Sequence, residues 1–466
     1  MKLRSVTLIA LMAMGCRSLT APPAVRRDAG IAPSAAEAWQ PPADAVPPIP
    51  PRTETPLPPG ITADTPITLA QIVDIALTNN PSTREAWLNA RAAQAALGSA
   101  ESLYFPEVDL SAALTRTQSA SQGSRTVFRQ TTLAPSLSLS YLLFDFGGRE
   151  AVVAQARQTL IAADYLHNQS IQDVVLRTEE AYYSYLQSKA LLAAQTSTLK
   201  ERQTELDAAN SRHDAGVATI ADVLQSKTAF SQAELTRESI AGGLRTIEGA
   251  LATAMGLPAS TRFNIGELPL EIPSTQVSEH VDDLIARAIA GRPDLAAARA
   301  AAEGTRAHVQ AIRSQYMPTV SLTSNLGRAF YNGGFQATPY AAGVALRFPL
   351  YTGGRNTFDV RQAELQSQVA AENVRAIEQN INLQVWTSYF TLQTATQRLG
   401  TAHDLLASAQ QSADVAHDRY RAGVGNILDL LTAEAALENA RAQEVQSRAD
   451  WFVAVAQLAH DTGSLR

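Results

Sequence analysis

Apolar and polar residues alternate in four short segments of the chain. They lie at residues 108–115 and 136–143, and again at 319–322 and 343–351. A period of two places apolar side chains on one face and polar side chains on the other, as in a β-strand. The pattern therefore predicts two pairs of amphipathic strands, joined by polar, Gly-rich loops such as 331–339.

Each pair of strands is followed by a very long segment without helix breakers. Residues 151–213 contain neither Gly nor Pro, and residues 355–420 contain no Pro and only Gly400. About 63 helical residues are about 95 Å long, which is longer than a globular domain accommodates. A Gly-containing turn follows, and a second helix is expected to return over 219–256 and 426–460. The sequence therefore predicts two long antiparallel helical hairpins.

The two halves of the chain carry the same landmarks in the same order. Matched positions differ by 212 residues in the first helices, by 206 at the Gly-Gly-Arg sequences and by 207 at the hairpin turns. Self-similarity of this kind indicates an internal two-fold repeat. The matched landmarks are Asn80-Pro81 with Arg292-Pro293, Phe105-Pro106 with Met317-Pro318, Gly147–Arg149 with Gly353–Arg355, and Arg212–Val217 with Arg419–Val424.

The N-terminus has the features of a processing signal. Two basic residues precede the apolar run Val6–Gly15, which has the length of a signal-peptide core and is too short to span a membrane as a helix. Ala13–Cys16 follows the pattern of a lipobox, with Ala13 where Leu is usual, and Cys16 is the only cysteine. We predict cleavage and acylation at Cys16. The alternative is an ordinary signal peptide with an incidental cysteine.

Proline composition marks a separate segment after this signal. Residues 22–60 hold more than half of the 23 prolines, so the segment is expected to be extended or disordered. We interpret it as a tether between a lipid anchor and the folded body, and a proline-rich partner motif is the alternative.

Each repeat is expected to contain a helix, two strands and a long helical hairpin, in that order. The opening helix covers about 68–102 or 280–316, and Pro81 or Pro293 breaks or restarts it. The predicted divisions are a signal peptide at 1–15, an acylated Cys and Pro-rich tether at 16–61, a first repeat at 62–256, an equatorial linker at 257–279 and a second repeat at 280–466.

Four amphipathic strands are too few to close a membrane barrel, because known barrels start at about eight strands. An open strand edge is not tolerated in lipid, where no water can satisfy its backbone groups. The barrel must therefore close between chains, and three chains would supply 12 strands, an even number within the known range. A soluble β-sandwich with one polar face is the alternative.

The long helices are amphipathic but rich in Ala, Gln and Ser. A closed coiled-coil rod, the alternative, would need Leu-rich core positions. Small residues instead let helices pack side by side in a curved wall, and polar residues suit a water-filled lumen. We therefore predict an α+β membrane protein, a trimeric 12-stranded β-barrel that continues into a long periplasmic α-helical barrel.

Charge and motifs do not indicate an enzyme or a nucleic-acid-binding protein. The formal net charge is −6, and the seven histidines lack metal-ligand spacing. Gly147-Gly148 and Gly353-Gly354 are not followed by the Lys of a phosphate-binding loop. We predict no catalytic residues, no metal site, no cofactor and no nucleic-acid partner.

The duplicated landmarks, in this order, resemble those of the TolC outer-membrane efflux family over about residues 62–462. The cysteine of the lipobox makes the chain look like the lipoprotein branch of that family. The resemblance implies a homotrimer in the outer membrane of a Gram-negative bacterium, lipid-anchored at Cys16, with its helical tunnel in the periplasm. It also implies the role of exit duct in a tripartite pump, with a periplasmic adaptor and an inner-membrane transporter of RND, ABC or MFS type.

Two alternatives for the function stay open. A type I outlet for secreted proteins would have the same fold, and an envelope scaffold without a pore would show no conductance. The sequence does not identify the cargo, which could be a drug, a metal ion, a solvent or a polypeptide.

The resemblance assigns roles to the two hairpin tips. Gly216, Val217, Gly423 and Val424 lie at tips that constrict the tunnel and dock the adaptor in the family. These four residues are therefore the expected docking site.

The resemblance also implies a gate next to the tips. Tyr420 and Asp222 match the family's gate residues, whereas the position of the family's gate Arg is Gly425, for which Arg419 or Arg421 could substitute. Asp429 matches an Asp that can ring the pore entrance and favour cations. The alternative for Asp429 is a helix N-cap or a first-turn carboxylate, which is favourable near a helix N-terminus.

Overall fold

The structure, a computed structural model, describes residues 66–120, 127–269 and 280–465. All of them belong to the unit Pro56–Arg466. The predicted signal peptide, Cys16 and the Pro-rich tether lie outside the described residues, as does part of the predicted linker.

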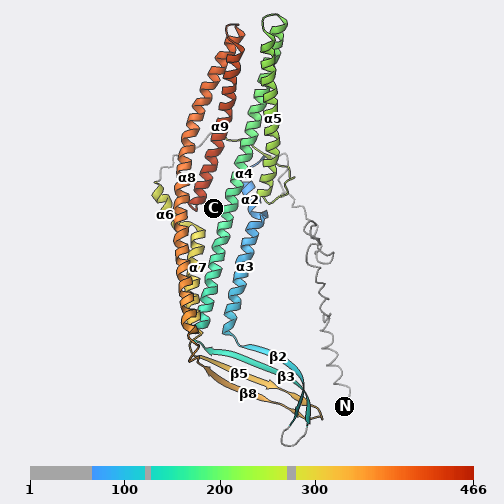
Figure 1. The fold of residues 1–466 in the computed structure, drawn as a ribbon, viewed down its shortest axis with the longest axis vertical. Helices are drawn as coiled ribbons and strands as arrows, with labels where there is room; N and C mark the ends of the chain where they lie inside the picture. Colours follow the sequence, from blue (N-terminus) through green and yellow to red (C-terminus); the bar gives the residue numbers. More distant parts are fainter. Residues whose placement is uncertain (1–65, 121–126, 270–279, 466) are drawn as a thin grey trace. The chain divides into compact units, whose positions relative to one another are not determined.

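Four long strands form one antiparallel sheet in the order β2-β3-β5-β8, as two amphipathic pairs predict (Figure 1). The strands are β2 (Glu107–Ala120), β3 (Val127–Phe144), β5 (Thr319–Gly327) and β8 (Tyr340–Arg347). Two short strands, β6 (Ala329–Tyr331) and β7 (Gln336–Ala337), pair with each other where the sequence predicts only a loop.

The ends of two strands differ from the prediction. β3 begins at Val127, well before position 136, because its backbone stays paired with β2 beyond the apolar alternation. β8 ends at Arg347, so the prediction that the strand continues to position 351 is wrong. Pro349 lies two positions further on, and proline cannot donate a hydrogen bond to a sheet ladder.

One face of the sheet carries an apolar row across all four long strands. Leu110 pairs with Leu137, Leu137 with Leu326, and Leu326 with Tyr340. All four side chains are exposed in the single chain, Leu110 at 79% and Tyr340 at 83%. The opposite face is polar, and the hydroxyls of Ser111 and Ser136 are 3.0 Å apart. The single chain therefore leaves an apolar sheet face uncovered.

Prolines break the first helix of each repeat, as predicted. Asn80 caps the helix that begins at Pro81, and its side-chain oxygen accepts a hydrogen bond from the amide of Ser82 at 2.9 Å. Proline suits the first helical position because no intrahelical partner is available for an amide there. The helix pairs are α2 (Leu69–Asn79) with α3 (Pro81–Glu101), and α6 (Val281–Gly291) with α7 (Pro293–Ser314).

The two predicted helical hairpins are present. α4 (Gly148–Asp214) and α8 (Arg355–Arg421) contain 67 residues each, so each is about 100 Å long. α5 (Ile220–Ala254) and α9 (Ile427–Asp461) return beside them. Each long helix therefore runs from the sheet to a hairpin tip (Figure 1).

None of the described helices has an apolar stretch long enough to cross a membrane.

Strand and helix meet at a Gly-Gly-Arg turn in each repeat. Gly147 and Gly354 both have φ +83°, a left-handed conformation that favours glycine. Arg149, after the first turn, donates a 2.7 Å hydrogen bond from Nη1 to the carbonyl oxygen of Leu142. The repeat equivalent, Arg355, is 72% exposed in its side chain and lies 3.9 Å from Asp359.

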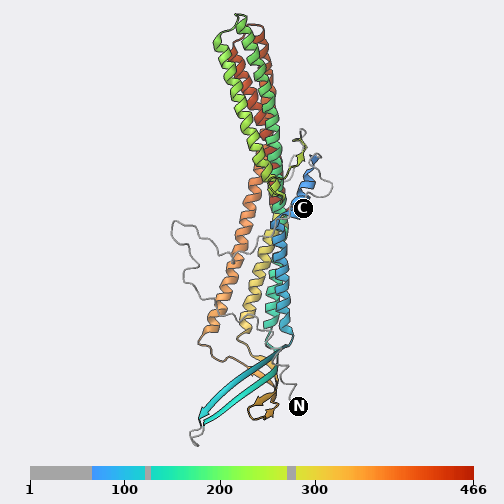
Figure 2. The same cartoon turned by 90° about the vertical axis from the view of Figure 1, so that its right-hand side faces the viewer.

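The helices next to the sheet pack in the same order as the strands. α3 packs on α4, α4 on α7 and α7 on α8 (Figure 2). Nearer the tips, α9 lies between α4 and α8 (Figure 1). The sheet and the helix layer are thus open walls with matching edges, α3 and β2 at one side and α8 and β8 at the other. Large apolar side chains are exposed on these edge helices, among them Trp87 and Leu88 on α3 and Leu383 and Trp386 on α8.

Buried side chains gather where the short helices meet the hairpins. One cluster joins α2, α4 and α5 around Ile72, Leu186 and Leu251, and also includes Ile265 of the two-residue strand β4 (Asn264–Ile265), which pairs with β1 (Pro66–Ile67). The other joins α6, α8 and α9 around Leu284, Ile381 and Trp451. Each cluster is therefore drawn mainly from one repeat, and Val445 of α9 also joins the first cluster.

A partly buried polar network ties the end of α9 to the rest of the chain. His460 Nε2 lies 2.9 Å from Asp173 Oδ1 on α4, and His460 Nδ1 lies 3.1 Å from Asp461 Oδ1. Arg292 donates to the backbone oxygen of Asp461 at 3.3 Å and to Gln384 on α8 at 2.6 Å. Ionic contacts therefore link both repeats at mid-length.

Candidate functional site: the hairpin tips and the contacts between them

Both hairpin tips have the same backbone turn. Gly216 and Gly423 have φ +76° and +75°. The amide three positions after the last helical residue bonds back to the helix, Val217 to the Arg212 oxygen at 2.9 Å and Val424 to the Arg419 oxygen at 3.1 Å. This is the Schellman arrangement, in which a left-handed residue ends the helix and glycine has no Cβ penalty. The glycines of the predicted docking motifs therefore shape both tips.

The valines of the tips project into solvent. Val217 is 66% exposed and Val424 is 70% exposed. An exposed valine at the apex of each hairpin gives a protein partner an apolar contact point, so the prediction that the tips dock an adaptor stays open.

The returning helices begin with different caps. Thr219 caps α5, and the Thr219 amide donates to Asp222 Oδ2 at 2.9 Å, which completes a capping box. Asn426 caps α9 and accepts from the Leu428 amide at 3.1 Å. Asp429 lies exposed in the first turn of α9 without a hydrogen bond or ion pair to any described residue. Its carboxylate is therefore not needed as a cap.

An arginine of the first hairpin covers the predicted gate tyrosine of the second. The Cζ atom of Arg212 lies 4.8 Å from the centre of the Tyr420 ring, and Arg212 Nη1 donates to the Tyr420 backbone oxygen at 3.2 Å. Tyr420 Oη is buried and has no hydrogen-bond partner among the described residues. The ring and the carbonyl of Tyr420, rather than its hydroxyl, thus make the contact.

The charged groups that act on the phenol of Tyr420 belong to the first hairpin. Burial raises the pKa of its phenol, the negative charges of Asp222 and Glu205 raise it further, and the positive charge of Arg212 opposes them. The structure therefore brings Asp222 and Tyr420 near each other without a hydrogen bond between them.

The predicted substitutes for the family's arginine do not fill that role in the single chain. Arg419 and Arg421 are exposed. At Gly425 an added Cβ would lie 2.9 Å from the Tyr420 amide nitrogen, so a larger residue would require the turn to shift. Arg212 was not predicted as a gate residue. Its place in the motif that is duplicated as Arg419–Val424 is the only signal for it in the sequence.

A second contact joins the hairpins about three helical turns before the tip of α4. Arg202 is 5% exposed and pairs with Glu434 of α9, and its Nη1 is 3.2 Å from Glu205 Oε2. Glu438 Oε2 lies 4.0 Å from Nη2 of Arg202. Nearer the surface, Arg441 Nη1 lies 3.0 Å from Glu201 Oε2. One buried guanidinium thus faces three carboxyl groups from two hairpins.

This cluster retains a proton at neutral pH. Burial raises the pKa of Glu434 to about 9, helped by a hydrogen bond and charge repulsion from Glu205 and opposed by Arg202. The neutral carboxyl can share its proton with Glu205. The contact between α4 and α9 therefore depends on both a guanidinium and a bound proton.

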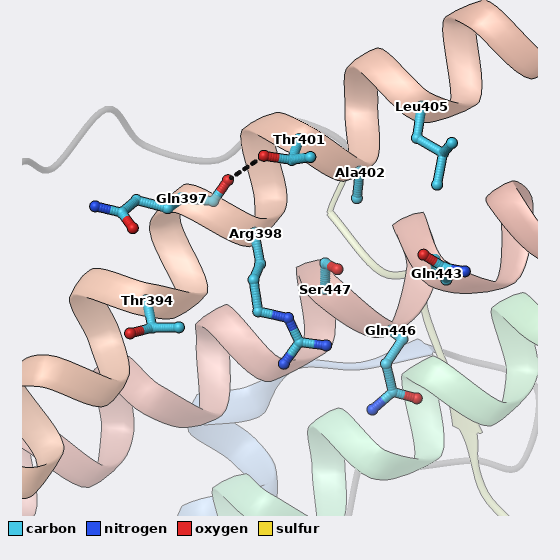
Figure 3. Close-up of a pocket in the computed structure, with 9 residues that line it drawn as sticks. All are labelled: Thr394, Gln397, Arg398, Thr401, Ala402, Leu405, Gln443, Gln446 and Ser447. Atoms are coloured by element: carbon cyan, nitrogen blue, oxygen red, sulfur yellow. Dashed lines mark hydrogen bonds between the residues drawn. The ribbon is translucent and has the colours of Figure 1, made fainter.

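A shallow groove runs between α8 and α9, well away from the tips. It has a volume of about 440 Å³ and is shown in Figure 3. Arg398 is the only ionisable residue among those that line it, and Thr401 donates to the Gln397 backbone oxygen at 3.1 Å. Such a lining has no general acid or base. Within the described part of the chain, no group of three or more His, Cys, Asp or Glu side chains could hold a metal ion.

Comparisons with known proteins agree with this arrangement. A family model described as "Outer membrane efflux protein" matches residues 72–257 and 284–464, which lie in the two repeats. The chain is 26% identical to the protein CyaE of Bordetella pertussis over 409 residues, 85% of this chain and 84% of CyaE. It is 25% identical over 374 residues to the outer membrane efflux protein BepC of Brucella suis, with 78% of each chain covered. The solved outer-membrane channel OprN has the same fold, with a TM-score of 0.78 at 18% identity, over 85% of this chain and 90% of OprN.

Proposed function

The chain belongs to the family of outer membrane efflux proteins, and we propose that it is the passive exit duct of a tripartite export pump. The family and the fold agree with the resemblance predicted from the sequence. In this role an inner-membrane transporter would supply the energy, and a periplasmic adaptor would connect it to the duct.

The proposal rests on one observation: in the described structure the sheet and the helix layer both end without a neighbour, and they do so at the same two sides of the chain. The sheet order β2-β3-β5-β8 leaves two unpaired edges and an uncovered apolar face, and the helix layer ends in α3 and α8 at the same sides. Lipid does not tolerate open strand edges, whereas a closed ring removes them. Three chains, joined edge to edge, would close both layers and place the apolar face of the strands against lipid.

Mass and conductance test this proposal together. The detergent-solubilised protein should have about three times the chain mass of 49.8 kDa, and planar lipid bilayers that contain it should conduct. A monomer that inserts stably, or a trimer that never conducts under any voltage or salt condition, would contradict the duct and favour an envelope scaffold.

The exposed carboxylate of Asp429 is proposed to ring the entrance in three copies. Asp429→Asn should lower the ratio of cation to anion permeability several-fold, because a ring of like charges attracts cations and repels anions. Reversal potentials in a salt gradient measure this ratio. Asp418→Asn removes another exposed carboxylate near the tip, 83% exposed in its side chain, and serves as the control. If both variants keep the wild-type ratio, Asp429 does not line the pore.

Acylation at Cys16 is proposed as the membrane anchor, although this residue lies outside the described part of the chain. Cys16→Ala should abolish incorporation of radiolabelled palmitate and leave the precursor uncleaved by lipoprotein signal peptidase. Arg17 follows the cysteine, rather than the Asp that commonly retains lipoproteins at the inner membrane, so the wild-type protein is expected in the outer-membrane fraction. Label that persists in Cys16→Ala would disprove acylation at this site.

A further inference from the structure

Arg212 makes two contacts with one residue of the other hairpin. Its guanidinium lies over the ring of Tyr420, with 4.8 Å between Cζ and the ring centre, and donates to the Tyr420 backbone oxygen at 3.2 Å. The two residues are 208 positions apart and occupy the last turns of α4 and α8. The contact therefore spans the two tips within one chain.

The simpler explanation is that Arg212 only stabilises the C-terminus of its own helix, α4, as a cation in the last turn of a helix does. The geometry is different, since Nη1 bonds to a carbonyl of α8 and not of α4. The last four carbonyls of a helix have no partner within it. The Tyr420 oxygen is one of these, and it also accepts from the Gly423 amide at 3.1 Å. Arg212 thus helps to complete the end of α8 from the neighbouring hairpin.

Burial strengthens this contact relative to an exposed pair. Arg212 Nε and Tyr420 Oη are both buried atoms without a hydrogen-bond partner in the described residues. Arg212 and Tyr420 are both half-buried, so the stacked pair is partly shielded from water. A partly desolvated cation over an aromatic ring interacts more strongly than a fully solvated one. Because the Tyr420 hydroxyl has no hydrogen-bond partner among these residues, the stacked guanidinium, rather than a hydrogen bond of the hydroxyl, holds the ring.

We infer that Arg212 is the positioning residue of the tip gate. Its guanidinium holds the ring and the backbone carbonyl of Tyr420, and so joins the two tips of one chain. Arg212 thereby takes the role that the resemblance implies for an arginine at position 425. The inference rests on the proposed function only in that the tips must constrict a conducting path. It assigns the lock to the Tyr420 ring, whereas a bond between Tyr420 and Asp222 would require the hydroxyl.

Single-channel conductance separates the two explanations. Arg212→Gln and Tyr420→Leu each remove the stacked pair, so the ratio of open to closed tips should rise roughly tenfold in either variant. Tyr420→Phe keeps the ring and should conduct like the wild type. Arg419→Gln, the repeat equivalent of Arg212, is exposed and is the matched control. The double variant should open no further than either single one, since the two act as one unit.

Several results would overturn the inference. Wild-type conductance in Arg212→Gln would remove Arg212 from the gate, and an open Tyr420→Phe channel would return the lock to the hydroxyl. If Arg212→Gln does not assemble, Tyr420→Leu alone decides, because it removes the ring and retains the arginine. A wild-type trimer that never conducts refutes the proposed function instead, so the two failures are distinguishable.

Discussion

Arg202→Ala is expected to destabilise the contact between the two hairpins by about 3–5 kcal/mol, the usual cost of removing one partner from a buried ion pair. Arg202 is 5% exposed and is the only guanidinium between Glu205, Glu434 and Glu438 in the described structure. Its loss leaves the Glu205 carboxylate without its counter-charge and the neutral carboxyl of Glu434 without its guanidinium partner. Amide hydrogen exchange should therefore become faster in the parts of α4 and α9 nearest the hairpin tips, and the midpoint temperature of thermal unfolding should fall.

Arg441→Ala provides the matched control for this variant. Its partner Glu201 is 46% exposed in its side chain, and such surface pairs contribute about 0–1 kcal/mol. Arg202→Lys should recover part of the loss, because it keeps the charge but not the fork of donors. Equal effects of Arg202→Ala and Arg441→Ala would show that the Arg202 cluster is no stronger than a surface pair.

Alkaline pH is expected to release the end of α9 by removing a proton from His460. Burial lowers the pKa of this imidazole, but hydrogen bonds and charge from Asp173 and Asp461 outweigh burial and raise it to about 9, from an ordinary value of 6.5. A raised pKa in the folded state gives stability that is complete below pH 6.5 and is lost as pH rises through 9. The loss should be about 2–3 kcal/mol.

The measurement is thermal unfolding of the detergent-solubilised protein between pH 6 and pH 10. Glu434 also has a raised pKa of about 9, so its contribution falls with rising pH as well. His460→Gln and Glu434→Gln each remove one titrating group, and the double variant should lose most of the pH dependence. If His460→Gln leaves the slope between pH 6.5 and 9 unchanged, His460 does not hold its extra proton in the folded state.

Much of the architecture could be predicted because it depends on local patterns. The absence of Gly and Pro from 151–213 indicates a single long helix, and Pro81 and Pro293 mark real helix starts. The order of landmarks then indicates the repeat. Strand ends were less predictable, because β3 extends through backbone pairing with β2 that no side-chain pattern encodes.

The contacts between hairpins could not be predicted for a different reason. The partners Arg212 and Tyr420 are far apart in sequence, and their meeting depends on the relative register of α4 and α8. The resemblance implies gate roles for Tyr420 and Asp222, but it places the gate arginine at position 425, which is glycine here. The same limit applies to Arg202, since nothing near it in sequence shows that Glu434 faces it.

The two Gly-Gly-Arg turns differ in how much mechanical freedom they leave at the base of each hairpin. A stiff helix of 67 residues acts as a lever, so a small rotation at its base becomes a large displacement at its tip. At Gly148, the first residue of α4, an added Cβ would meet Ser314 Oγ at 2.7 Å. Arg149 next to it donates to the Leu142 oxygen. Arg355, the first residue of α8, is instead 72% exposed in its side chain. The base of α4 is therefore a tightly packed joint and the base of α8 a loose one. A force on the two tips should therefore displace α8 and α9 more than α4 and α5.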